Sequence, residues 1–191
     1  MTAMKGQAMT QPTADDLETI KRLKARYFRF IDTKQWDALR GLFTDDATFD
    51  GLWAAAPTPE DFIDNISRNL GGSDITSVHY GFMPELEPID GDRVRGVWAM
   101  YDYLTWPPGE RAYLGVSLPG QWGIRGYGHY EEEYRRVGDT WLISHLRLTR
   151  LRIDPLVGEP LPGPDYPFVR ATTDWLPSSS AQPTAARGGV R

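Results

Sequence analysis

The sequence contains no cysteine, and this absence excludes disulfides, thiolate nucleophiles, zinc knuckles and iron–sulfur clusters. Histidine is also scarce. The three residues, His79, His129 and His145, form neither HxH nor HExxH nor another spacing typical of metal ligands. We therefore expect no zinc or non-haem iron site. The lack of cysteine also fits a reducing cytoplasm.

Long apolar runs are missing as well, since none approaches the roughly 20 residues that a membrane helix needs. The N-terminal residues lack the apolar segment of a secretory signal. There is no excess of basic charge, because 26 acidic residues outnumber 21 basic ones and give a net charge of −5. Proteins that bind nucleic acid or anionic membranes are usually basic. We expect a cytoplasmic protein that binds neither.

The 191 residues, of which 40% are hydrophobic, suffice for one domain with a true core. We divide the chain into a loose leader over residues 1–12, a domain over 13–153 and a tail over 154–191. The tail holds seven of the 15 prolines, a density that argues against a helix or a central strand. The tail also contains Tyr166, Phe168 and Trp175, and these aromatic residues suggest that its first part docks on the domain. The end of the tail is expected to be disordered.

Three helices are predicted in the first half of the domain. Thr13 is a suitable N-cap, acidic residues follow in the first turn, and apolar residues at three- and four-residue spacing continue the helix to about Asp32. A short second helix is predicted over 35–43 and a strand over 47–51. The third helix, over 59–70, has a proline in its first turn and two glycines past its end.

From residue 75 the pattern changes to long strands separated by tight turns. The predicted strands are 75–89, 93–106, 121–137 and 140–153, with turns at 90–92, 107–109 and 138–139. Helices followed by a meander of strands indicate an α+β fold with an antiparallel sheet. Such a sheet, curled around the helices, forms a cone with an apolar interior.

Strand alternation singles out Asp102. It falls on the apolar face of the strand 93–106, together with Val94, Gly96, Trp98, Met100 and Leu104. A carboxylate on such a face is costly unless a cation or hydrogen-bond donors lie close by, so Asp102 is a candidate functional residue. The alternative is that Asp102 lies near the strand end and reaches water or a backbone N–H.

The last strand carries Arg150. Alternation places it on one face with Leu142, Ser144, Leu146 and Leu148, while the other face holds Ile143, His145, Arg147 and Leu151. The second face is mixed, so the pattern leaves open which face lies inward. An inward Arg150 is able to pair with Asp102 or to bind a substrate oxygen. A purely structural ion pair fits the spacing at least as well.

Three further polar residues lie in predicted helices or strands. Asp32 ends the first helix, where the helix dipole disfavours a carboxylate, so a compensating partner is expected. Tyr27 belongs to the apolar stripe of that helix, and a buried phenol needs a hydrogen-bond partner. His79 lies in a strand with two fairly apolar faces. A lone strand histidine is more often structural than catalytic, and a core tyrosine is the simpler interpretation of Tyr27.

Three segments, residues 20–49, 77–104 and 128–153, resemble in order a SnoaL-like domain of the NTF2-like superfamily. Within this superfamily the sequence resembles the bile acid 7α-dehydratases and, more distantly, the scytalone dehydratases. The resemblance covers residues 14–153 and leaves out the proline-rich tail. It implies the cone-shaped α+β fold of that superfamily, also called cystatin-like.

The resemblance also implies a set of site residues. These dehydratases combine a helix tyrosine and a nearby aspartate with a strand histidine, a second strand aspartate and an arginine of the last strand. The matching positions are Tyr27, Asp32, His79, Asp102 and Arg150, with Arg147 in place of Arg150 if the register slips.

The implied chemistry is elimination of water beside a carbonyl by general acid–base catalysis without a cofactor. In this hypothesis His79, oriented by Asp102, is the base or proton shuttle, and Tyr27 donates to an oxyanion or leaving group. Arg150 and Asp32 position these groups or the substrate.

A hydrophobic small-molecule substrate is expected. With Tyr27, the aromatic and apolar residues Phe28, Trp53, Trp98 and Met100 predict a pocket suited to a flat polycyclic compound such as a steroid or bile-acid-like ketone. The segment 105–125 is expected to hold substrate-selective loops.

Two alternatives remain open at this stage. One is another acid–base enzyme on the same fold, such as a ketosteroid-isomerase-like or polyketide-cyclase-like enzyme. The other is a non-catalytic ligand-binding or accessory subunit, which would not need the full set of polar residues. Since the relatives commonly pack through the outer face of the sheet, we expect a homo-oligomer, a trimer rather than a dimer.

Overall fold

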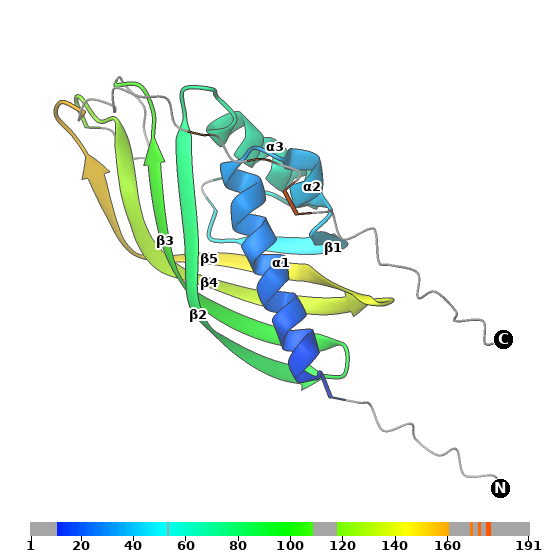
Figure 1. Cartoon of the computed structure of the whole chain (residues 1–191). Coiled ribbons are helices and arrows are strands. Elements are labelled where there is room, and N and C mark those ends of the chain that lie inside the picture. The colour runs from blue at the N-terminus through cyan, green and yellow to red at the C-terminus, as the bar shows by residue number, and fades with distance from the viewer. Residues whose placement is uncertain are drawn as a thin grey trace, which may run out of the picture.

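The computed structural model describes residues 11–52, 54–108 and 118–160, and the single residues 169, 172, 175 and 176. The helices are α1 (Ala14–Asp32), α2 (Trp36–Arg40) and α3 (Pro59–Leu70). The strands are β1 (Phe43–Asp50), β2 (Thr76–Asp90), β3 (Arg93–Thr105), β4 (Gly123–Val137) and β5 (Thr140–Leu156). The α+β prediction is confirmed, and the long strands curve around the helices (Figure 1).

The helix ends follow from local hydrogen bonds. Thr13 caps α1 by accepting from the backbone N–H of Asp16 at 3.2 Å, and the Asp16 carboxylate accepts from the Thr13 N–H at 2.8 Å. Thr58 caps α3 in the same way, accepting from the Asp61 N–H at 3.1 Å. Because these caps depend on residues three positions apart, the predicted starts of both helices are confirmed to within one residue.

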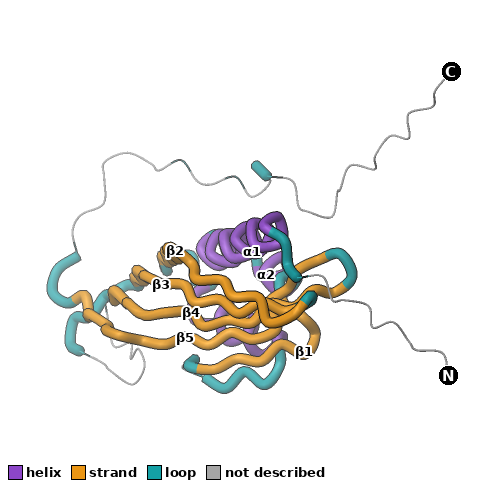
Figure 2. Tube along the Cα trace, turned by 90° about the horizontal axis from the view of Figure 1, so that it is seen from below, coloured by secondary structure: helices purple, strands orange, loops and turns teal. Residues whose placement is uncertain are grey.

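The five strands form one sheet in the order β1-β5-β4-β3-β2 (Figure 2). The four long strands pair antiparallel, as predicted. The first strand differs in two ways: it begins at Phe43 instead of residue 47, and it pairs parallel to β5. Its partner is nearly 100 residues away, and local patterns do not specify the direction of such a pairing.

The last strand is longer than predicted. It continues through Pro155 to Leu156, whereas the prolines had suggested an end at residue 153. β1 pairs with β5 only between Ile143 and Arg147, so the far end of β5 has β4 as its single neighbour among the described strands. Proline has no backbone N–H to donate to a neighbouring strand. It is tolerated at such an edge because no strand lies there to accept that hydrogen bond.

A β-bulge decides which side chains of β5 face inward. Tyr134 pairs with Ile143 and Glu133 pairs with His145, so Ser144 is left without a partner across the ladder. Its hydroxyl donates instead to the Glu133 carbonyl at 3.2 Å. The predicted grouping of Leu142 and Ser144 with Arg150 is therefore wrong, because the extra residue reverses the alternation. Beyond the bulge the buried residues of β5 are Leu146, Leu148 and, at its end, Leu156.

The core contains a charged network that the apolar pattern did not reveal. Lys24 and Glu132 are both 0% exposed, and the Lys24 ammonium donates to Glu132 Oε1 at 2.5 Å. The Tyr134 hydroxyl donates to the other Glu132 oxygen and accepts from Trp98 Nε1 at 2.8 Å. Burial lowers the pKa of Lys24, and the Glu132 carboxylate counteracts that effect. The network thus satisfies two charges that would be costly alone.

The tail is described at few positions. Trp175 is 82% exposed, while Tyr166 and Phe168 lie outside the described residues, as do the leader residues 1–10. Docking of the tail stays a prediction. Among the described residues, no helix has both the length and the apolar character needed to cross a membrane.

Candidate active site

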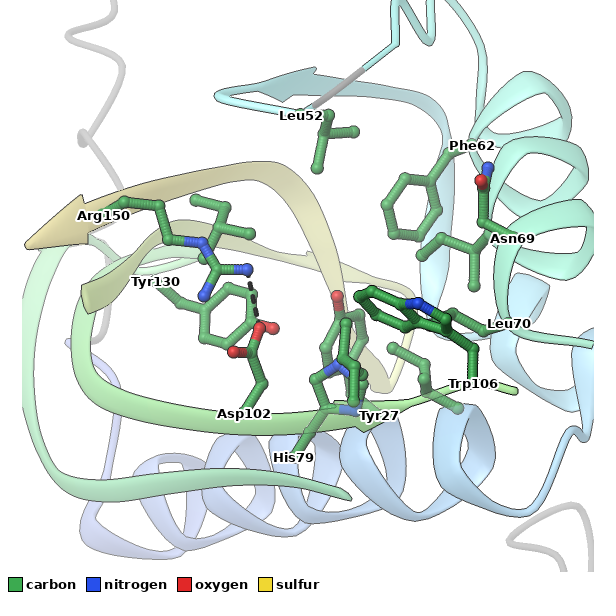
Figure 3. Close-up of a pocket in the computed structure, with 14 residues that line it drawn as sticks. Tyr27, Leu52, Phe62, Asn69, Leu70, His79, Asp102, Trp106, Tyr130 and Arg150 are labelled. Carbon is green, nitrogen blue, oxygen red and sulfur yellow. Dashed lines mark hydrogen bonds and ion pairs between the residues drawn. The ribbon is translucent and has the colours of Figure 1, made fainter. Parts of the chain in front are cut away.

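A cavity of about 70 Å³ lies between the end of α1, the inner face of α3 and the inner face of the sheet. Asp102 and Arg150 face Phe62, Leu70 and Trp106 across it (Figure 3). Its lining residues are Tyr27, Ile31, Leu52, Phe62, Ile66, Asn69, Leu70, His79, Asp102, Leu104, Trp106, Tyr130, Leu148 and Arg150. All five residues taken from the dehydratase resemblance are therefore at the cavity or, in the case of Asp32, bonded to a residue that lines it.

His79 and Asp32 form a tightly bonded pair. Asp32, the last residue of α1, accepts from the His79 backbone N–H at 2.8 Å and from His79 Nδ1 at 2.7 Å. Because a carboxylate only accepts, Nδ1 carries the proton and Nε2 is the nitrogen left with a lone pair. The hypothesis that Asp102 orients His79 is wrong, since Asp32 does so. These two hydrogen bonds from His79 also offset the unfavourable interaction between the Asp32 carboxylate and the dipole at the C-terminus of α1.

Asp102 pairs with Arg150. Asp102 is 1% exposed, and Arg150 Nη2 donates to its Oδ2 at 2.6 Å. The regular alternation of β3 points Asp102 inward. On β5 the bulge at Ser144 shifts the inward positions to Leu146, Leu148 and Arg150, so the two charged side chains meet on the inner face of the sheet. Arg147 points to the other face, where it lies 3.4 Å from Glu131, so Arg150 is the arginine of the cavity.

Gly126 provides the space for this ion pair. It is paired with Asp102 across the ladder, and a Cβ atom built on it would lie 2.1 Å from Asp102 Oδ1 and 2.2 Å from Arg150 Nη1. Any side chain at this position would overlap the pair. A glycine inside a strand commonly marks such a close approach.

Two phenols border the cavity beside these charges. Tyr27 and Tyr130 are buried and hydrogen-bonded to each other, with ring centroids 5.7 Å apart. Burial raises the pKa of both phenols, and negative neighbours raise it further. Both therefore stay protonated at neutral pH. The bond between them uses one of the two O–H groups, so the other is available as a hydrogen-bond donor. Sequence reasoning missed Tyr130, although it shares the inward parity of Gly126 and Gly128 on β4.

The opposite wall is apolar and comes largely from α3. Phe62, Ile66 and Leu70 follow one another at four-residue spacing, so they share one helix face. Asn69 adds a polar group there and donates to the Asn65 carbonyl at 2.6 Å. That spacing was available in the sequence, but only the fold shows that this face of α3 covers the cavity.

Three of the predicted pocket residues do not line the cavity. Phe28 packs over Gly81, where a Cβ would lie 2.6 Å from its ring, and Trp98 is hydrogen-bonded to Tyr134 in the core. Met100 lies behind the ion pair, with its sulfur 3.7 Å from Arg150 Nη1. Trp53 is outside the described residues. Within residues 11–52, 54–108 and 118–160, no three His, Cys, Asp or Glu side chains are grouped so as to hold a metal ion.

Comparison with known families agrees with this architecture. The family model for the SnoaL-like domain matches residues 12–147. The chain belongs to the SnoaL-like family. Its α+β cone is the fold of that family, in which a curved sheet encloses the helices.

Relatives of this SnoaL-like chain include named enzymes. It is 29% identical over 147 residues to "Probable cyclase FGR4" of Gibberella zeae, covering 69% of this chain and 89% of the relative. A solved hexachlorocyclohexane dehydrochlorinase, LinA-type3 of Novosphingobium barchaimii LL02, has a TM-score of 0.63 and 22% identity over 78% of this chain and 96% of its own. A "Putative Scytalone Dehydratase" of Novosphingobium aromaticivorans DSM 12444 has a TM-score of 0.62 and 13% identity over 76% and 90%. At these identities the two structures show the fold alone.

Proposed function

We propose that this chain is a lyase that eliminates water beside a carbonyl group of a hydrophobic cyclic substrate by general acid–base catalysis. The observation that carries the proposal is the pair of His79 and Asp32 at the edge of an otherwise largely apolar cavity. An imidazole whose Nδ1 proton is held by a carboxylate presents Nε2 as a base. Such a base removes a proton from carbon most effectively where water is excluded.

The proposed step balances without another reactant. His79 Nε2 takes the proton from the carbon next to the carbonyl, so the C–H bond breaks and an enolate forms. The electron pair then makes the C=C bond as the C–O bond to the hydroxyl breaks. The proton held by His79 passes to the leaving hydroxide and completes a water molecule. The histidine returns to its neutral form.

The remaining polar groups suit charge stabilisation. The enolate oxygen needs a donor that is in place before the reaction, and the O–H group that the bonded pair of Tyr27 and Tyr130 leaves over is such a donor. Arg150, anchored by Asp102 at 2.6 Å, supplies a fixed positive charge on the same side of the cavity. We assign Arg150 the role of binding the leaving hydroxyl or a second oxygen of the substrate.

Two kinds of relative support an elimination. One solved neighbour is named a dehydrochlorinase and another is named for scytalone dehydration, and both names describe loss of a small molecule from a ring. The resemblance to the bile acid 7α-dehydratases points to a steroid-like substrate. The cavity of about 70 Å³ is far smaller than the roughly 300–1,000 Å³ of common ligand pockets, so a four-ring substrate requires its walls to move. A one- or two-ring hydroxyketone needs less movement.

The test is a panel of one- and two-ring β-hydroxyketones together with a 7-hydroxylated 3-oxo-Δ4 steroid. In that steroid the conjugated C=C bond makes the proton on C6, next to the hydroxyl-bearing carbon, acidic. Products are read by mass and by the absorbance of the new conjugated system. Loss of one water by the wild type, and not by His79→Ala, is the expected result. An isobaric rearranged product would show an isomerase instead. Tight binding without any product, unchanged in His79→Ala and Asp32→Asn, would rule out the lyase.

A cyclase is the second candidate, and the relative named a cyclase favours it. The same base would form an enolate, and that enolate would attack a second carbonyl of the substrate to close a ring. The product would then be a ring with the mass of the substrate, or of the substrate less one water if dehydration follows. Mass together with a two-dimensional NMR spectrum separates this outcome from simple elimination.

We also propose a homo-oligomer, a trimer, formed through the outer face of the sheet. Aromatic rings run across this face from β2 to β4, with Tyr80 and Tyr101 centroids 6.4 Å apart and Tyr101 and Tyr127 centroids 5.5 Å apart. Tyr80 is 52% and Phe82 is 50% exposed. Exposed apolar patches of this kind are typical of interfaces. Light scattering is expected to show a trimer that Phe82→Glu dissociates, and a monomeric wild type would contradict this.

A further inference from the structure

The residue that follows the C-cap of α1 has an unusual backbone. Lys34 has a φ of 60°, in the left-handed region. Its N–H donates to the Ile31 carbonyl at 3.1 Å, and the Gln35 N–H donates to the Phe30 carbonyl at 2.8 Å. This is the Schellman ending of a helix, in which glycine is the common residue at the left-handed position. A lysine there is strained by its Cβ atom, so its side chain merits a functional explanation.

The side chain of Lys34 reaches the strand that carries His79. Its ammonium donates to the Ser77 hydroxyl at 2.9 Å, and Ser77 is 5% exposed. Ser77 and His79 are two residues apart on β2 and share its inner face. Burial lowers the pKa of the Lys34 ammonium, and the charge of Asp32, two residues earlier, counteracts that effect. Through Ser77 the ammonium is thus held next to the strand segment that carries the His79 partner of Asp32.

We propose that Lys34 is a positioning residue for that pair, holding Asp32 in its ionised, His79-bonded state and thereby setting the pH range in which His79 is a neutral base. A positive charge at this place stabilises the Asp32 carboxylate and disfavours a second positive charge on the imidazole. A glycine would relieve the backbone strain but would supply neither the charge nor the link to Ser77. The role assigned to His79 rests on the proposed function, whereas its electrostatic coupling to Lys34 does not.

Other charged or titratable groups also face His79. They are Asp32 and Tyr27 from α1, Asp102 from β3, Tyr130 from β4 and Arg150 from β5. Asp102 lies directly across the ladder from His79, but its charge is paired with Arg150. The phenols stay neutral at neutral pH because burial raises their pKa. Lys34 is therefore a cation placed to act on Asp32 from just beyond the end of α1.

The experiment compares Lys34→Gly with Lys34→Arg and with Met83→Gly. Met83, the other described non-glycine residue with a positive φ, at 39°, is 91% exposed on β2 and makes a matched control for relief of strain. The imidazole signals of the three histidines are followed by NMR against pH, and the signal lost in His79→Gln identifies His79.

Lys34→Gly is expected to move the titration midpoint of His79 upward by about half to one pH unit, because the imidazolium loses a repelling charge. The acidic limb of the pH–rate profile moves upward by the same amount. At a fixed pH below the midpoint the fraction of neutral His79 is then smaller, so turnover falls by about threefold to tenfold. Lys34→Arg keeps the charge and leaves the midpoint within a few tenths of a unit of the wild type. Met83→Gly does not move it.

Thermal unfolding separates this role from a structural one. Relief of strain offsets the lost hydrogen bond to Ser77, so Lys34→Gly is expected to keep the Tm within about 2–4 °C of the wild type. An unchanged His79 midpoint in Lys34→Gly would overturn the proposal, whatever happens to the Tm. The NMR titration needs no substrate, so it decides the matter even if the panel of hydroxyketones yields no product.

Discussion

Lys24→Met is expected to lower the free energy of unfolding by about 3–5 kcal/mol, because it leaves the Glu132 carboxylate buried without its cation. Both side chains are 0% exposed, and the ammonium lies 3.9 Å and 3.6 Å from the ring centroids of Tyr27 and Tyr130. Methionine fills the space of the lysine stem but supplies no donor. Urea denaturation followed by tryptophan fluorescence measures the loss.

The same helix offers a matched control for this experiment. Lys21 and Glu18 also form an ion pair, at 2.6 Å, but their side chains are 44% and 54% exposed. Lys21→Met is expected to change the stability by no more than the error of the measurement, since water screens such pairs. The double variant Lys24→Met/Glu132→Gln removes both buried charges and is expected to be more stable than Lys24→Met alone. Equal effects at Lys24 and Lys21 would contradict the picture of a buried network.

His79→Ala is expected to lower the turnover of any substrate found in the panel by about 10²–10⁴-fold, the usual contribution of a general base. Its effect on KM should be small, because the apolar wall from α3 is untouched. Asp32→Asn should act in the same direction, since an amide is able to donate to His79 Nδ1 and then favours the wrong tautomer. Steady-state kinetics with the purified variants measures both effects.

A histidine on the other face of the sheet serves as the control. His129 lies on β4 with its side chain turned away from the cavity, so His129→Ala should retain the turnover of the wild type. If His79→Ala raised KM and left turnover unchanged, the histidine would be a binding group, and the assignment of His79 as the base would be wrong. Circular dichroism of each variant verifies that the fold is kept.

Sequence reasoning located Asp102 and Arg150 by different means. The alternation of β3 is regular, so simple parity placed Asp102 on the buried face. On β5 the bulge at Ser144 reverses the alternation, so parity was right to group Arg150 with Leu146 and Leu148 but wrong to add Leu142 and Ser144, which come before or at the bulge. Nothing in the local sequence marks this bulge. It becomes visible only in the register between β4 and β5.

The partner of His79 is a second case. Asp32 was recognised as a carboxylate in need of compensation, and Asp102 was assigned to His79 as part of the chemistry that the dehydratase resemblance implies. The structure places Asp102 across the ladder from His79 yet bonds it to Arg150, and it brings the end of α1 to His79 instead. Whether His79 of β2 bonds Asp32 of α1 or Asp102 of β3 depends on differences of a few ångströms between these three elements, which no local pattern specifies.

Local sequence patterns were enough to predict α1 and α3 with their caps, the tight turns after β2 and β4 and the inward face of β3, whereas α2 is shorter than predicted and the turn expected at 107–109 extends beyond the described residues. Each of these depends on residues within a few positions of one another, where backbone geometry and side-chain spacing are set locally. The parallel pairing of β1, the buried pair of Lys24 and Glu132, the partner of His79 and the role of α3 as a cavity wall became known from the folded chain alone. These features join groups that are distant along the chain, and their energy arises only when folding removes the groups from water and brings them into contact.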